Sequence, residues 1–526
     1  MELYIKNIRI IDGTASPAYR AGIGIENGKL KIIRNSPDCT AETVLDGTGL
    51  TAVPGFIDAH SHGDLNMASD YPTASKITQG ITSQIAGQCG FSMFPAGSSP
   101  ESFQNFQFFI QRVSPYPDFP KESRFCSTFR TFQDWVDNLE NPVSTYSFVG
   151  HGTLRVWAMG YANRKPDRTE LQRMQTMLRQ CIRDGALGLS TGLVYAPICY
   201  ADNDEILALL NIVKEEGGFF ACHPRNESDT VLEARLESMR LAREAHVPLC
   251  ISHMKAAGHD NWGKPGRFLE EVDRALNAGE RLLIDTYPYM AGCTALNVSI
   301  PPRYFIHGMD SLVEALQDPV ECRKIEKELQ VKSTEYENFI YNCNGYDGVL
   351  VSSCPFFHDA EGLRITEYAE KTNQSPFDAY REILIKNHGQ GLAIYFHMCE
   401  EDVLDVLRHP CCAVGTDGLI GNPDANPHPR VFGTMPRAFR MLTKEHSIFT
   451  EEEAIFKMTG LPAGFLRLDG KGLLKDGYDA DLLLLDMEKF KDTSSYSNGN
   501  SPAEGLKYVI KNGKIVAMER YNSFLK

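Results

Sequence analysis

Short runs of alternating apolar and polar residues open and close the chain. Residues 1–55 contain several such runs, and Asn27-Gly28 stands between two of them, as in a two-residue hairpin turn. Residues 468–526 repeat the pattern, with Asn512-Gly513 in the corresponding position. We therefore predict that both ends of the chain contribute strands to one small domain, a β-sandwich.

The chain between these ends, residues 56–467, follows a different rhythm. Short apolar segments alternate with stretches typical of helices, such as 169–184 and 204–216, which predicts parallel strands joined by helical crossovers. Eight candidate strands are what a (β/α)8 TIM-like barrel requires, although a doubly wound sheet fits the same periodicity. The candidates begin at Thr51, Ser83, Ser147, Leu187, Gly218, Leu249, Leu282 and Cys412.

Residues 292–348 interrupt the alternation of strands and helices. The segment is long for a single connection, and long connections in compact domains usually carry a function. We therefore expect an inserted lid or subdomain over the mouth of the barrel.

Composition and charge exclude several classes of protein. Of the 526 residues, 42% are hydrophobic and 23% charged, as in globular proteins, and the net charge of −15 argues against a nucleic-acid partner. The chain opens directly into strand-like alternation and has no apolar run of bilayer-spanning length, so we expect a cytoplasmic protein without membrane attachment. The 14 cysteines are then expected to be core residues or ligands, not a disulfide framework.

The first candidate site residues lie in Pro54-Gly-Phe-Ile-Asp-Ala-His-Ser-His. His60 and His62 are two positions apart, so on an extended strand both rings point to the same side and can face one ion. Such pairs are often surface or core residues, but this pair follows an apolar strand candidate. We interpret it as a candidate metal-binding pair.

Four further residues of metal-binding type each follow a different strand candidate. In a (β/α)8 barrel the active site lies at the C-terminal strand ends, where these side chains would meet the two histidines. Taken singly, the cysteine also fits a free buried thiol and the aspartate a turn cap. Together they predict a metal site, since thiolates, imidazoles and carboxylates are zinc ligands. The four residues are Cys89, His223, His253 and Asp417.

Several motifs resemble those of the amidohydrolase superfamily and, within it, the N-acyl-D-amino-acid deacylases (D-aminoacylases). The stretch from Pro54 to His62 is similar to the superfamily's first barrel strand. The resemblance extends over nearly the whole chain. Motifs of the deacylase branch include Gly87-Gln-Cys-Gly-Phe-Ser, Gly185-Ala-Leu-Gly-Leu-Ser-Thr-Gly, Asp285-Thr-Tyr-Pro-Tyr-Met-Ala-Gly and His428-Pro-Arg-Val-Phe-Gly-Thr.

This resemblance implies a division of the metal-binding residues. Related cyclic-amide hydrolases have a carboxylated lysine where the deacylases have a cysteine, and Cys89 matches the cysteine. One tightly bound Zn²⁺ is thereby implied on Cys89, His223 and His253. A second, weaker metal position is implied between His60, His62 and Asp417.

The expected chemistry is hydrolysis of an amide bond. Zinc held by three protein ligands leaves a place for water and lowers the pKa of that water to about 7. Asp417 is the expected general base, which takes the proton of the water and passes it to the leaving amine. Tyr287 is the expected donor to the developing oxyanion, unless it is only a core aromatic residue at a strand end.

Two cationic residues are expected to hold the substrate. Lys255 and Arg430 match family positions and would clamp the α-carboxylate, for which the planar guanidinium of arginine is well suited. Cys293 is also expected at this place. Many relatives have a serine there that contacts the carboxylate, so that contact is lost here or passes to Thr294. Two extra residues also separate Asp417 from Arg430.

Other residues have less defined roles. Val194 and residues of the 292–348 segment are expected to line the pocket for the substrate side chain. His151, Arg225 and Glu227 match family patterns and are expected either to orient metal ligands or to form buried ion pairs. His397 follows an apolar segment, and as an isolated histidine it is expected to be structural.

The resemblance implies zinc-dependent hydrolysis of N-acyl-D-amino acids, which are small molecules, to a carboxylate and a free D-amino acid. The preference for D over L rests on the resemblance alone. Alternatives on the same scaffold are a dipeptidase acting on a C-terminal D-residue and a cyclic-amide hydrolase. A non-catalytic assembly protein is disfavoured, because the metal-binding residues and Asp417 are all present.

Overall fold

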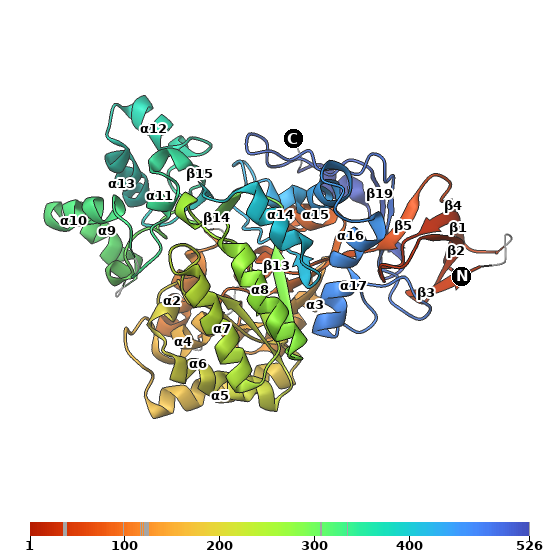
Figure 1. The fold of residues 1–526 in the computed structure, drawn as a ribbon, viewed down its shortest axis with the longest axis horizontal. Helices are drawn as coiled ribbons and strands as arrows, with labels where there is room; N and C mark the ends of the chain where they lie inside the picture. Colours follow the sequence, from red (N-terminus) through yellow and green to blue (C-terminus); the bar gives the residue numbers. More distant parts are fainter. Residues whose placement is uncertain are drawn as a thin grey trace.

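Short parallel strands lie at the centre of the computed structural model, which describes residues 1–34, 39–97, 99–115, 117, 119, 126–305, 308–333 and 335–524 (Figure 1). They form two sheets, ordered β6-β7-β8 and β9-β10-β11-β12-β13-β17. The two sheets meet at β8 and β9, which only Phe148 separates. At their other edges, after β6 and β17, the main-chain N–H of Ala59 donates to the Val414 carbonyl and that of Asp417 donates to the His60 carbonyl. The strands are β6 (Phe56–Asp58), β7 (Ile81–Ala86), β8 (Ser144–Ser147), β9 (Val149–Gly150), β10 (Gly188–Gly192), β11 (Phe219–His223), β12 (Leu249–Ile251), β13 (Leu282–Thr286) and β17 (Cys412–Val414).

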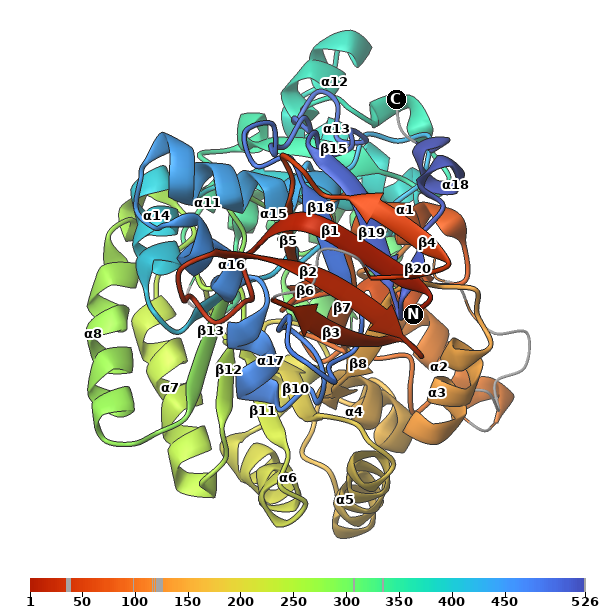
Figure 2. The same ribbon diagram turned by 90° about the vertical axis from the view of Figure 1, so that its right-hand side faces the viewer.

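Helices follow these strands in the chain and surround them, as expected for a (β/α)8 TIM-like barrel (Figure 2). The predicted helices at 169–184 and 204–216 are confirmed. They begin where Asp167 and Asp202 accept hydrogen bonds from main-chain N–H groups of the first turn. The helices of the barrel are α1 (Asp70–Ile77), α2 (Pro100–Gln111), α3 (Phe129–Asp137), α4 (His151–Met159), α5 (Arg168–Arg183), α6 (Asn203–Glu215), α7 (Val231–Ala245), α8 (Lys264–Asn277), α14 (Glu400–Arg408), α15 (Arg430–Arg440), α16 (Glu451–Lys457) and α17 (Gly460–Leu466).

Strands from both ends of the chain join in one eight-stranded sheet, at the right of Figure 1. Its order is β20-β19-β18-β5-β1-β2-β3, and β4 also pairs with β1, so the sheet branches there. Both predicted hairpin turns are present, and their Asn and Gly residues have φ between 49° and 80°, as a type I′ turn requires. The strands are β1 (Leu3–Ile10), β2 (Tyr19–Glu26), β3 (Lys29–Ile33), β4 (Thr43–Asp46), β5 (Thr51–Pro54), β18 (Leu482–Leu485), β19 (Leu506–Lys511) and β20 (Lys514–Ile515); α18 (Met518–Asn522) follows them.

One strand prediction needs correction. The candidate that begins at Thr51 is β5 of this small sheet, and the first barrel strand is β6, which starts after Gly55. A Cβ atom on Gly55 would lie 2.1 Å from the Thr82 hydroxyl, so only glycine fits where the chain passes from one sheet to the other.

A separate unit follows β13 and projects at the upper left of Figure 1. Its antiparallel sheet has the order β14-β16-β15, and its apolar cluster takes in residues from Leu296 to Tyr395. Because β16 pairs with both other strands, the unit continues beyond Gly348 to the end of β16. It comprises β14 (Ala291–Ala295), α9 (Met309–Gln317), α10 (Pro319–Leu329), α11 (Phe339–Asn342), β15 (Val349–Ser353), α12 (Ile365–Thr372), α13 (Pro376–Lys386) and β16 (Leu392–Phe396).

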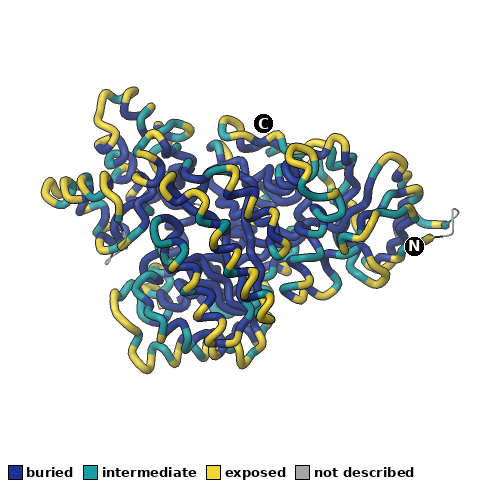
Figure 3. Tube along the Cα trace, in the orientation of Figure 1, coloured by how far each residue is buried: buried dark blue, intermediate teal, exposed yellow. Residues whose placement is uncertain are grey.

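Buried residues are concentrated in the barrel and continue into the base of the projecting unit, whereas exposed residues occupy the outer turns (Figure 3). Within the described part of the chain, every helix is too short or too polar to cross a bilayer. Buried polar groups gather at the C-terminal ends of the barrel strands, where the candidate site is found.

Candidate metal centre and active site

The six predicted metal-binding side chains meet at the C-terminal ends of the barrel strands. Residues far apart in the sequence are brought together there because parallel strands all end at the same side of a barrel. Each of the six is at most 8% exposed. They are His60 and His62 after β6, Cys89 after β7, His223 at the end of β11, His253 after β12 and Asp417 after β17.

The Cys89 sulfur lies at the centre of this group. It is 3.2 Å from His253 Nε2 and 3.4 Å from His60 Nε2. Ligand atoms on a tetrahedral zinc with Zn–S near 2.3 Å and Zn–N near 2.0 Å are about 3.3–3.6 Å apart, which is close to these distances. Potential ligand atoms lie within 4.8 Å of one another in four overlapping groups: Cys89, His223 and His253; His60, His62 and Cys89; His60, His253 and Asp417; and His223, Glu227 and Glu337.

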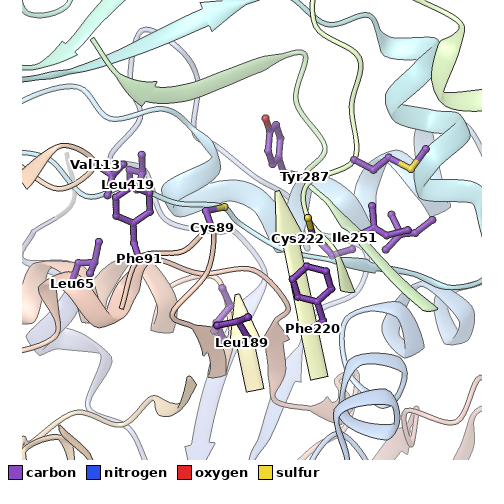
Figure 4. Packing of buried hydrophobic residues seen from close by; sticks show 14 of the residues in the cluster. Leu65, Cys89, Phe91, Val113, Leu189, Phe220, Cys222, Ile251, Tyr287 and Leu419 are labelled. Carbon is purple, nitrogen blue, oxygen red and sulfur yellow. The ribbon is translucent and has the colours of Figure 1, made fainter. Parts of the chain in front are cut away.

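Backbone conformation contributes to this geometry. Cys89, His253 and Asp417 have φ of 54°, 29° and 48°, in the left-handed region that residues other than glycine rarely adopt. Such conformations cost on the order of 1–3 kcal/mol each and cluster at functional sites. The surrounding packing therefore stabilises the inward orientation of these side chains (Figure 4 shows Cys89 and Tyr287 among the buried apolar residues).

Two carboxylates contact the Nδ1 atoms of two of the histidines. Asp285 Oδ1 lies 3.0 Å from His60 Nδ1, and Glu227 Oε1 lies 3.0 Å from His253 Nδ1. At His60 such a carboxylate fixes the tautomer and leaves Nε2 free to bind a metal, whereas His253 Nδ1 also lies 2.8 Å from Lys255 Nζ. The sequence motif Asp285-Thr-Tyr contained the first of these partners, but its role was not predicted.

The donor set fits a metal ion. His223 is buried, burial lowers its pKa, and both of its ring nitrogens lack a hydrogen-bond partner among the described residues. Buried polar atoms without a partner are rare and indicate an absent ligand. Burial raises the pKa of the Cys89 thiol, but the imidazoles of His253 and His60 outweigh it and hold that pKa well below its usual range. The cluster thus offers a neutral imidazole and a thiolate, the forms that bind zinc.

Asp417 stands between the histidines and a cation. Its Oδ1 lies 3.3 Å from His62 Nε2, and its Oδ2 lies 2.9 Å from Arg430 Nη1. Burial raises the pKa of this carboxyl, but the charges of Arg430 and His253 outweigh it and keep the pKa well below its usual range. Asp417 is therefore a carboxylate at neutral pH, able to accept a proton.

The predicted substrate clamp lies beside Asp417. The Arg430 guanidinium stacks 4.6 Å from the centre of the Tyr287 ring and donates to the Cys293 carbonyl. Lys255 Nζ lies 2.6 Å from Glu227 Oε2. Burial raises the pKa of the Cys293 thiol to about 12, so this side chain is a neutral, weak donor where the resemblance expects a serine.

One cavity connects these groups, with an open space of about 30 Å³. The structure brings Tyr287, Lys255, Cys293 and Arg430 to its wall, but in place of Val194, which is only half-buried, its neighbour Tyr195 lines the cavity. Phe339 of the 292–348 segment lines the cavity, as that segment was predicted to do, and further lining residues that the sequence did not indicate as substrate contacts are Phe91, Val113, His397 and Leu419.

Other residues predicted to orient ligands lie in different places. Glu227 contacts the metal cluster, as described above. The two ring nitrogens of His151 are hydrogen-bonded to Thr191 and Glu205, and Arg225 forms an ion pair with Glu237. Neither His151 nor Arg225 lines the cavity. These two therefore belong to structural networks.

Glu337, from the projecting unit, gives a pH-dependent prediction. It accepts a hydrogen bond from the main-chain N–H of Glu227, and burial together with the Glu227 charge raises its pKa to about 8. Because the ordinary glutamate pKa is about 4.3, the folded state binds this proton more tightly, and stability falls as pH rises toward 8. As pH rises from 6 to 8.5, the free energy of unfolding of Glu337→Gln is therefore expected to increase by about 2 kcal/mol relative to that of the wild type.

Urea unfolding of the metal-loaded proteins at both pH values measures this difference. Glu335→Gln, at an exposed position two residues earlier, is the matched control and is expected to track the wild type. Parallel stability profiles for Glu337→Gln and the wild type would contradict the prediction.

Comparisons with known proteins agree with this geometry. The Amidohydrolase family model matches residues 372–517. D-aminoacylase of Alcaligenes xylosoxydans xylosoxydans is 30% identical over 99% of this chain and 95% of its own, and N-acyl-D-glutamate deacylase of the same organism is 28% identical over 98% and 93%. The crystal structure of N-acyl-D-glutamate deacylase from Bordetella bronchiseptica, complexed with zinc and a phosphonate inhibitor, superimposes with a TM-score of 0.81 at 28% identity, covering 98% of this chain and 96% of that one.

The fold, the donor set and these relatives define a metal-dependent amidohydrolase. Within that class, the chain belongs to the N-acyl-D-amino-acid deacylase (D-aminoacylase) family. Hydantoinase and dihydropyrimidinase structures match at TM-scores of 0.51–0.55 and 14–16% identity, which reflects the shared fold.

Proposed function

We propose that this protein hydrolyses the amide bond of N-acyl-D-amino acids, using zinc held by Cys89, His223 and His253. The observation that carries the proposal is the thiol at the centre of the histidine cluster, next to a buried carboxylate and two cations in one cavity. The names of the relatives, D-aminoacylase and N-acyl-D-glutamate deacylase, supply the substrate class and its stereochemistry.

Zinc bound there would polarise an amide carbonyl and make a water molecule more acidic. His60, His62 and Asp417 would hold a second, weaker ion. Because Cys89 also lies 3.4 Å from His60 Nε2, its sulfur is within reach of both positions.

Asp417 moves the proton in this proposal. Its carboxylate is ionised and faces the histidine cluster, so it can accept a proton from the attacking water and return it to the nitrogen of the leaving amine. Arg430 holds the other oxygen and thereby orients the carboxylate.

Tyr287 supplies a hydrogen bond to the oxygen that becomes negative. Its side chain is 1% exposed, and its hydroxyl donates only to the Met398 sulfur, at 3.9 Å, among the described residues. Sulfur is a weak acceptor, so a stronger one in the substrate would displace it. A donor placed in advance of the reaction stabilises charge without reorganisation.

Arg430 and Lys255 bind the α-carboxylate of the substrate. Arg430→Lys is expected to raise KM for the N-acyl-D-amino acid about 10- to 100-fold, because lysine cannot form the paired hydrogen bonds of the guanidinium. Steady-state kinetics on the purified variant test this. Arg437→Lys, on the same helix but bonded to the Pro288 carbonyl, is the control and should leave KM unchanged. An unchanged KM in Arg430→Lys would remove this residue from the clamp.

The overall proposal is tested by metal analysis together with a substrate comparison. We expect one tightly bound zinc per chain and turnover of N-acetyl-D-amino acids in preference to their L-enantiomers. Absence of bound metal would refute the mechanism. Turnover of L-substrates, or of dipeptides with a C-terminal D-residue alone, would refute the assignment of substrate.

A further inference from the structure

His397 is a buried polar residue that the reaction as proposed does not use. It follows β16, is 2% exposed, and packs beside the rings of Phe339 and Tyr395. It lines the cavity, and neither of its ring nitrogens has a hydrogen-bond partner among the described residues. A buried imidazole without partners is costly, which indicates that a ligand completes it.

The space in front of this ring is kept open by Gly292. A Cβ atom at that glycine would lie 3.1 Å from His397 Nε2 and 3.5 Å from the Tyr287 hydroxyl. Gly292 itself lines the cavity, so both polar groups border the same open volume. Any side chain at position 292 would fill it.

The imidazole in this position is neutral. Burial and the nearby charge of Lys255 lower the pKa of His397 to about 3. A neutral imidazole presents one N–H donor and one bare nitrogen acceptor. The group that complements it must itself be able to accept and donate.

The charges around the cavity are already paired. Of the described lining residues, Lys255 and Arg430 are the cations apart from histidine, and they lie 2.6 Å from Glu227 and 2.9 Å from Asp417. Both are also assigned to the α-carboxylate of the substrate. A second carboxylate on the substrate would therefore meet only a neutral ring, and burying an unpaired charge is strongly unfavourable.

We propose that His397 recognises the side chain of the D-amino acid and selects a neutral amide, as in D-glutamine or D-asparagine, over a carboxylate. The side chain and the α-carboxylate leave the same carbon atom, so a residue that lines the same cavity as Lys255 and Tyr287 is within reach of the side chain. An amide oxygen accepts from the imidazole N–H, and the amide N–H donates to the bare nitrogen. This inference rests on the proposed hydrolysis of N-acyl-D-amino acids.

The test compares kcat/KM for N-acetyl-D-glutamine, N-acetyl-D-glutamate and N-acetyl-D-methionine in the zinc-loaded enzyme. The wild type is expected to favour the glutamine substrate about tenfold or more over each of the others. His397→Leu should lower kcat/KM for glutamine about tenfold and leave methionine unchanged or improved, since one lost pair of hydrogen bonds has that effect. His397→Asn, which keeps a donor and an acceptor, should restore part of the preference.

Each result has a defined meaning. A wild-type preference for glutamate, or an equal loss on all three substrates in His397→Leu, would overturn the inference and leave the proposed function standing. A zinc-loaded wild type that hydrolyses none of the three would overturn the proposed function, and this inference with it. The thermal unfolding midpoint of His397→Leu should not fall, because the variant replaces an unpaired polar ring with an apolar group.

Discussion

Cys89→Ala is expected to lose the tightly bound metal and to lower kcat/KM for N-acyl-D-amino acids by about a thousandfold or more, equivalent to ~4 kcal/mol. The physical reason is the central place of the thiol. Cys89 is common to two of the candidate ligand groups, so its removal weakens both metal positions at once. Metal content per chain and steady-state kinetics on the same preparation measure the two effects.

Cys250→Ala is the matched control for this variant. Cys250 is also buried and lies on β12, three residues before His253 in the sequence. It lies outside the candidate ligand groups. It should retain full metal content, with at most a modest loss of stability from the small cavity left behind. Full zinc content and normal turnover in Cys89→Ala would show that the ligand set is wrong.

Asp417→Asn is expected to lower kcat by about 10²–10⁴-fold while metal stays bound at Cys89, His223 and His253. An amide of nearly the same shape cannot accept the proton of the attacking water. We therefore expect kcat to fall far more than the metal content. This pattern distinguishes a residue that carries the proton from a principal metal ligand. Parallel measurement of bound metal and of kcat tests this.

The variant also leaves the Arg430 guanidinium without its carboxylate. Removing one partner of a buried ion pair costs about 3–5 kcal/mol, so assays belong at a temperature well below its unfolding midpoint. Asp424→Asn, at an exposed position in the loop between Asp417 and Arg430, is the control and should behave as the wild type. Loss of all metal from Asp417→Asn, or unchanged kcat, would contradict the assigned role.

Local patterns in the sequence were enough to predict much of the fold. The Asn-Gly pairs define tight turns because only such residues accept positive φ at both central positions. Asp167 and Asp202 begin helices because their carboxylates satisfy free N–H groups of the first turn. The strand candidate at Thr51 was counted among the barrel strands although it belongs to the small sheet, since β5 and β6 are both apolar and only their partners distinguish them.

The types and order of the metal-binding residues were likewise determined by the sequence, because each follows an apolar strand and parallel strands end on one side. What only the tertiary structure decided is how these residues are paired. The contacts of Asp285 with His60 and of Glu337 with Glu227 join distant segments, and Arg430 meets Asp417 across the loop 418–429. Residue type alone does not indicate them, since a carboxylate or imidazole acquires its charge and role from burial and from the neighbours that packing brings to it.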